Sequence, residues 1–199
     1  LFSGFISSIA TISAMGARVK ESPHLLSATV AGAVLSSLAT ILQIAMLLLA
    51  IHPPSLIALQ WPLIFGGLSI AIYGLIATVN CYHDPHVDAH KQTKTFSVKT
   101  ALLFAAIIAI ILIASAALNA WFGQAGLVVA SGVAGLADVH AAVISITSLV
   151  ASGKISIQSA VIPILVAFSV NTLVKAVIAQ VTGGTQFARL VVPALAIQV

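Results

Sequence analysis

The stretch 127–150, LVVASGVAGLADVHAAVISITSLV, is apolar apart from small polar residues, one acid, Asp138, and one imidazole, His140. A helix needs about 20 apolar residues to cross the roughly 30 Å hydrocarbon core of a bilayer, so this length predicts a transmembrane helix. An ionisable group inside such a helix costs about 2.5 kcal/mol or more and therefore faces protein or water. The stretch indicates a membrane protein with a polar position inside the bilayer.

The composition of the whole chain agrees with a membrane protein. Of its 199 residues, 60 % are hydrophobic and 6 % are charged, whereas a soluble domain is about 25 % charged. The net charge is +4, but no dense basic cluster with interleaved aromatic residues exists to follow a nucleic-acid backbone. The lipid bilayer is the expected partner, and nucleic acid is not.

Hydropathy predicts an all-α, polytopic transmembrane bundle of about seven spans within a single domain, 1–199. The expected apolar stretches are 2–17, 26–51, 57–79, 99–121, 126–150, 157–181 and a shorter piece, 187–199. If the spans alternate in direction, lysine and arginine gather in the connectors 18–25, 80–99 and 151–156, which the positive-inside rule places in the cytoplasm. Because the chain starts at Leu1 and both ends are apolar, we expect it to be part of a longer protein.

The two ends of the chain resemble each other. Residues 4–10, GFISSIA, align with 135–141, GLADVHA, at an offset of 131, and Pro62 aligns with Pro193 at the same offset. With one inserted residue, 37–43 align with 169–175. The pattern predicts two parallel three-helix repeats, about 1–79 and 123–199, joined by a linker and fourth span, 80–122.

Three short motifs carry a resemblance to a known family. The segments GFISSIAT (4–11), GLADVHA (135–141) and NTLVK (171–175) resemble motifs of the uncharacterised C-terminal membrane domain of MgtC/SapB-type bacterial membrane proteins. The matching positions are Ser7, Ser8, Ala10, Thr11, Gly135, Asp138, Ala141, Asn171, Thr172 and Lys175. Ile9 replaces the family's usual threonine, and His140 replaces a second acid. The resemblance implies a multi-pass protein of the bacterial inner membrane.

Asp138 and Lys175 are charged residues within the expected spans. In antiparallel neighbouring helices their side chains, which lean toward the start of each helix, converge on one level of the membrane. Asn171 lies one turn from Lys175 on the same face. We therefore expect an interaction between Asp138 and Lys175 with Asn171 as a third member, serving either as an ion-binding site or as a structural pair.

Small and polar residues at helical spacing accompany this pair on other helices. Ser7, Ser8 and Thr11 on the first span and Gln43 on the second are expected to face it. Close packing through small residues is the structural alternative. In a continuous helix His140 points about 200° away from Asp138 and is expected to contact another helix. A proton relay is the alternative, because imidazole titrates near neutral pH.

The connector 80–99 contains metal-binding residue types. Cys81, His83, His86 and His90 are the candidate ligands, and the last two have i, i+4 spacing. Pro85 and the lack of an established zinc pattern favour a solvated loop instead. No cofactor is otherwise expected.

The functional prediction is a transporter or channel-like protein for a small ion, with a cation favoured by Asp138. The alternative is a non-transporting regulatory or assembly protein, partnered by a second copy or another membrane subunit. An enzyme is not expected, because the chain has no H-E-x-x-H or G-x-S-x-G motif and no second intramembrane acid beside Asp138.

Overall fold

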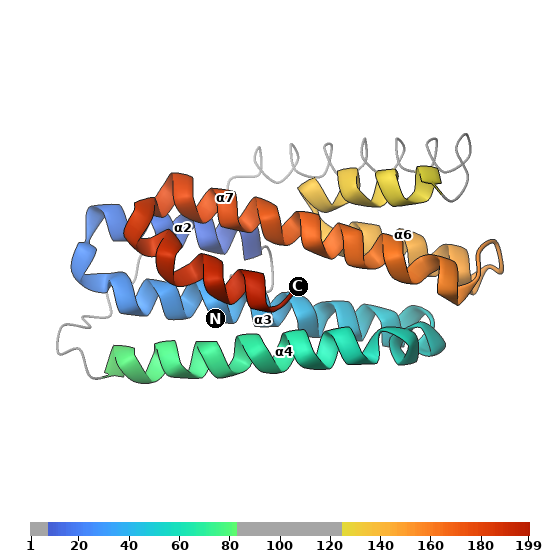
Figure 1. Cartoon of the computed structure of the whole chain (residues 1–199), viewed down its shortest axis with the longest axis horizontal. Coiled ribbons are helices and arrows are strands. Elements are labelled where there is room, and N and C mark those ends of the chain that lie inside the picture. The colour runs from blue at the N-terminus through green and yellow to red at the C-terminus, as the bar shows by residue number, and fades with distance from the viewer. Residues whose placement is uncertain (1–7, 83–124) are drawn as a thin grey trace. The chain divides into compact units, whose positions relative to one another are not determined.

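The computed structural model describes residues 8–82 and 125–199, with no side-chain description for 80–82, and these parts of the chain are helical. Figure 1 shows the arrangement of the helices. In chain order the elements are α2 (Ser8–Glu21), η1 (Pro23–Leu25), α3 (Leu26–Ile51), α4 (Pro53–Tyr82), the helix Ala125–Ala137, α6 (Val139–Ala151) and α7 (Ile157–Ile197). No strand occurs within the described ranges, which confirms the all-α class.

Three helices in the described part of the chain are long and apolar enough to cross a membrane. They are Pro23–Ile51, which includes η1, Pro53–Val79 and Ile157–Ile197. These helices match the expected spans 26–51, 57–79 and 157–181. The expected span 99–121 lies outside the described residues, and the total of about seven spans stays a prediction.

The expected single span 126–150 is wrong: the segment forms two helices that meet at Asp138. Helix Ala125–Ala137 runs in one direction, and α6 runs back beside α7 (Figure 1). Each helix is about 20 Å long, too short to cross a bilayer alone. Hydropathy averages do not detect this break, because it depends on the side chain of Asp138. We call Ala125–Ala151 the helical hairpin.

A five-residue connector joins α6 to α7. Gly153 has a φ of 70°, and the amide of Lys154 donates to the carbonyl of Leu149 at 2.9 Å. This six-to-one hydrogen bond with a left-handed glycine is a Schellman motif, which ends α6 and lets the chain turn directly into α7.

The second break lies within α7. Gly184 has φ 75° and ψ −175°, a backbone conformation that is essentially restricted to glycine. It divides α7 into a long helix, 157–183, and a C-terminal arm, 185–197. The arm corresponds to the expected short apolar piece 187–199.

The described chain forms two compact units. Of the described residues, unit 1 contains 8–46, 59–82 and 172–199, and unit 2 contains 47–58 and 125–171. In unit 1 the arm runs antiparallel to α4: Tyr73 Oη donates to the carbonyl of Leu190 at 2.6 Å, and Ser69 lies opposite Ile197. The glycine at position 66 permits this contact, because a Cβ there would lie 2.7 Å from the carbonyl oxygen of Gln198.

The long helix of α7 also runs antiparallel to α3 within unit 1. Thr40 of α3 lies opposite Lys175, whereas Lys20, in the last turn of α2 before the chain turns through η1 into α3, donates to the carbonyl of Val181 at 2.9 Å. Residue numbers on α7 therefore rise as those on α3 fall. The close approach at this end requires Gly16, where a Cβ would overlap Thr182.

These directions correct the expected arrangement of the repeats. The starts of α3 and α7 differ by the expected offset of 131 residues, and so do the start of α4 and the break at Gly184. Corresponding helices of a parallel repeat would point the same way, but both pairs are antiparallel. The parallel arrangement is therefore wrong for these helices, because the hairpin turns back where a full crossing was expected.

Candidate functional site

Asp138 begins α6 as its N-cap. Its backbone is extended, with φ −161° and ψ 120°, while its amide still donates to the carbonyl of Ala134 at 2.9 Å. Its carboxylate accepts hydrogen bonds from the amides of His140 at 3.1 Å and Ala141 at 3.3 Å. The side chain thus satisfies two of the donors that a helix start leaves unpaired.

His140 pairs with the same carboxylate. Its Nδ1 lies 2.7 Å from Oδ1 of Asp138, and both side chains are about one quarter exposed, at 24 % and 29 %. The expectation that His140 points away from Asp138 is wrong. That expectation assumed about 100° of rotation per residue in a continuous helix, whereas Asp138 is not helical.

The second ring nitrogen of His140 has a different environment. Nε2 is buried and has no hydrogen-bond partner among the residues that the structure describes. An ionised carboxylate can only accept hydrogen bonds, so the short contact assigns a proton to Nδ1. In the neutral ring Nε2 then carries an unshared lone pair.

Asn171 of α7 contacts the helix that precedes the break at Asp138. Its amide Nδ2 donates to the carbonyl of Gly135 at 3.2 Å, and its side chain is 3 % exposed. Gly135 lies in the last turn of its helix, where carbonyls lack intrahelical partners. The backbone of Gly135 packs directly on that of Ala167, leaving no room for a Cβ.

These groups form one polar cluster within unit 2, which we call the hairpin site: Asp138, His140, Asn171 and the carbonyl of Gly135. Asp138 is the single formally charged residue between positions 125 and 151. The helix Ala125–Ala137 directs its partly negative C-terminus toward the break, and Asp138 offsets the partly positive start of α6. The electrostatics of the hairpin site therefore favour a cation.

Lys175 belongs to a separate polar cluster in unit 1. It is fully buried, and its Nζ donates to Oγ1 of Thr40 at 3.1 Å. Nearby on the same helix, Thr172 accepts a hydrogen bond from Nε2 of Gln198 at 3.3 Å, which ties the end of the arm to α7. The expected interaction between Asp138 and Lys175 stays a prediction.

The remaining expected residues are distributed as follows. Ser8 and Thr11 are buried on α2, and Gln43 is half-buried on α3, all in unit 1. Ser7, His83, His86, His90 and the side chain of Cys81 lie outside the described residues. Within the described ranges no group of three or more histidine, cysteine or acidic side chains is arranged to hold a metal ion.

Sequence reasoning singled out Asp138 and Asn171 for an interaction with Lys175, and it missed the pairing of His140 with Asp138 and the contact of Asn171 with Gly135. One signal was present in the sequence: an aspartate directly before an apolar run is a typical helix start. In the segment ADVHA, 137–141, this signal predicts that a new helix starts at Asp138. The side chain of His140, in the first turn of that helix, then lies close to the carboxylate of Asp138.

The fold and the hairpin site together define a helical domain with membrane-compatible helices and a polar interruption in an apolar segment. The chain belongs to the family described as a domain of unknown function, DUF4010, whose model matches residues 1–183. Comparison with curated proteins and with solved structures found no match.

Proposed function

We propose that this chain is a membrane transport protein for a small cation, which binds at the hairpin site. The observation that carries the proposal is the interruption of an apolar segment at Asp138, where a carboxylate, a buried amide and a helix C-terminus meet. Broken backbone within hydrocarbon is tolerated only where protein or a water-filled cavity surrounds it. Transporters place such breaks near the midplane to bind their ions.

The antiparallel pairing of corresponding helices supports the same class. α3 with α7, and α4 with the arm, repeat at an offset of 131 residues and run in opposite directions. Inverted repeats with discontinuous helices are typical of secondary transporters, in which one repeat moves against the other around a fixed site. A packing role alone does not require this symmetry.

The proposed topology follows from the hairpin. Because the two helices of the hairpin enter and leave on one side, the proposal puts the connector 151–156 on the side opposite to 18–25, in place of the cytoplasmic location expected from the sequence. The basic connectors 18–25 and 80–99 then mark the cytoplasmic side, and Arg189 joins them at the start of the arm. The resemblance to MgtC/SapB-type proteins supports the bacterial inner membrane as the location.

The experiment is a flux assay in proteoliposomes, with Na⁺, K⁺ and Mg²⁺ tested separately. We expect wild-type protein to move at least one of them above the rate of empty vesicles, and Asp138→Asn to reduce that rate at least tenfold. Glu21→Gln makes the same acid-to-amide change at an exposed position and should leave the rate unchanged. Flux absent from the wild type, or equal in the two variants, would contradict the proposal.

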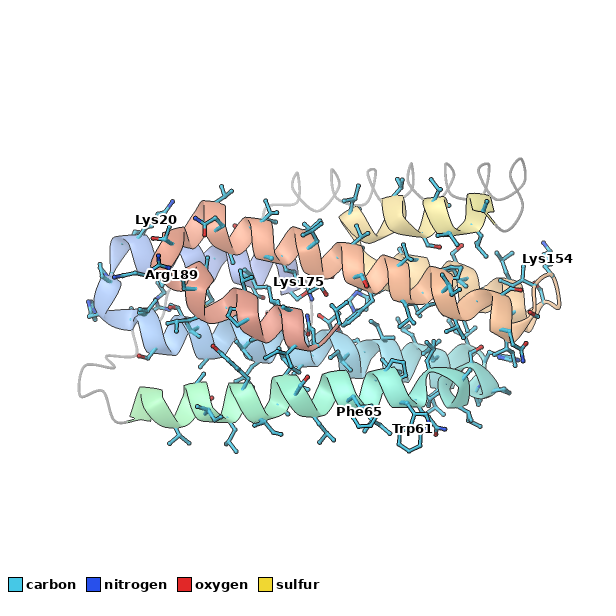
Figure 2. All side chains as sticks on the ribbon, in the orientation of Figure 1. Lys20, Trp61, Phe65, Lys154, Lys175 and Arg189 are labelled. Carbon is cyan, nitrogen blue, oxygen red and sulfur yellow. The ribbon has the colours of Figure 1, made fainter. Side chains whose placement is uncertain are left out.

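A non-transporting membrane subunit is the second candidate. Large apolar side chains follow one face of α4, including Trp61 at 61 % and Phe65 at 65 % exposure, and these two stack on each other. Figure 2 shows both side chains on the outer side of α4. Such a face contacts lipid or another apolar helix. A stable complex containing inactive protein, with no flux of any tested ion, would favour this candidate.

A further inference from the structure

We propose that one end of unit 1 binds the headgroup of an anionic phospholipid through Lys20 and Arg189. The inference goes beyond ion transport and does not depend on it. Two separate segments bring these cations together, because Lys20 lies in the last turn of α2 and Arg189 lies in the second turn of the arm. Both side chains are exposed. We call Lys20, Val181, Arg189 and Leu190 the basic corner.

The break at Gly184 keeps the two cations at the same end of unit 1. Nζ of Lys20 donates to the carbonyl of Val181 at 2.9 Å, within one turn of the break. In a continuous helix Arg189 would lie about 12 Å beyond Val181. The arm instead runs back along the long helix of α7, because Gln198 at its end donates to Thr172 (Figure 1). Figure 2 shows Lys20 and Arg189 at this end.

The basic corner is positively charged. Among the described residues neither Lys20 nor Arg189 forms a salt bridge with an acid. Arg18 is a third cation in the last turn of α2, and Glu21 is the single acid in the described part of unit 1. These four residues have a net charge of +2, which attracts an anion.

Exposed apolar side chains next to both cations distinguish a lipid from free phosphate. Val181, whose carbonyl accepts from Lys20, is exposed, and so is Leu190, which follows Arg189. Val177, one turn before Val181, is exposed as well. A phospholipid offers a phosphate to the cations and acyl chains to these apolar side chains, whereas inorganic phosphate leaves them in water. The basic corner therefore fits a phospholipid.

The chemistry of the cations favours an anionic headgroup. Ammonium and guanidinium groups donate charge-assisted hydrogen bonds to phosphate oxygens, and arginine can donate two in parallel. In the topology proposed above, this end of unit 1 faces the cytoplasmic leaflet, whose anionic lipids attract basic residues beside membrane helices. A zwitterionic headgroup carries its own positive charge and is attracted less.

Native mass spectrometry of delipidated protein in detergent tests the proposal. The probes are dioleoyl phosphatidylglycerol, dioleoyl phosphatidylcholine and inorganic phosphate, each titrated separately. We expect phosphatidylglycerol to bind most tightly. Arg189→Gln and Lys20→Gln should each raise its dissociation constant about fivefold. Lys154→Gln, which removes an exposed cation from the connector between α6 and α7, should leave the constant unchanged.

Three results would each overturn the proposal. They are equal affinity for the two lipids, affinity for inorganic phosphate equal to that for phosphatidylglycerol, and equal affinity of Arg189→Gln and Lys154→Gln for phosphatidylglycerol. Lys20→Gln also alters the contact to Val181, whereas Arg189 has no hydrogen bond or salt bridge among the described side chains. Arg189→Gln therefore decides the outcome if Lys20→Gln melts at a lower temperature than wild type without lipid. The assay measures no flux, so its failure leaves the proposed cation transport untouched, and absent flux leaves the lipid result untouched.

Discussion

Replacing Asp138 separates its structural role from its charge. Asp138→Ala removes the acceptor of two amide hydrogen bonds at the start of α6 and of the contact from His140. Loss of an N-cap costs about 0.5–2 kcal/mol. The histidine contact adds little, because both side chains are partly exposed and water can replace it. We expect α6 to lose about 1–2 kcal/mol of local stability. Asp138→Asn should lose only a few tenths, because asparagine caps helices as well as aspartate.

Amide hydrogen exchange measures this difference at the cap itself. For His140 and Ala141, 1–2 kcal/mol corresponds to exchange about 5–30 times faster in Asp138→Ala. In Asp138→Asn the rates should stay within about twofold of wild type. The amides of Ser152 and Gly153 at the other end of α6 have their own backbone acceptors and serve as the internal control. Equal exchange in the two variants would refute the capping argument.

Further predictions concern packing and backbone. Gly184→Ala should lower stability by about 1–3 kcal/mol in thermal unfolding in detergent, because alanine does not tolerate φ 75° with ψ −175°; an unchanged melting temperature would contradict the break there. Gly135→Ala should cost about 1–3 kcal/mol through overlap with Ala167, whereas Gly132→Ala, whose nearest neighbour would lie at 3.5 Å, should be tolerated. Lys175→Ala should have a lower melting temperature than Lys175→Met, because only methionine fills the buried space of the lysine stem. The expected difference in the free energy of unfolding is about 2–4 kcal/mol, and equal melting temperatures would contradict the burial of Lys175.

The sequence predicted the long helices because apolar length alone determines them. The starts of α3 and α7 were correct to the residue. The break at Asp138 was missed because it depends on one side chain accepting two amide hydrogens, which a hydropathy average cannot register.

That single omission also explains the wrong direction of the repeats. Counting 126–150 as a crossing adds one reversal between α3 and α7, so corresponding helices were expected to point the same way. A hairpin that enters and leaves on one side adds no net reversal of direction, so corresponding helices run antiparallel. Asp138 and Asn171 were singled out because polar side chains in an apolar segment are rare. The structure shows Asp138 half-buried and Asn171 buried, and their part in an ion site stays a prediction.

The side of the membrane reached by each end of the helical hairpin tests the central claim most directly. In a Cys81→Ser background, single cysteines at Ala125, Lys154 and Lys20 would be labelled with a membrane-impermeant maleimide in vesicles of known orientation. The account predicts that Ala125→Cys and Lys154→Cys react from one side and Lys20→Cys from the other. Reaction of Ala125→Cys and Lys154→Cys from opposite sides would show that the segment crosses the membrane and would contradict the account.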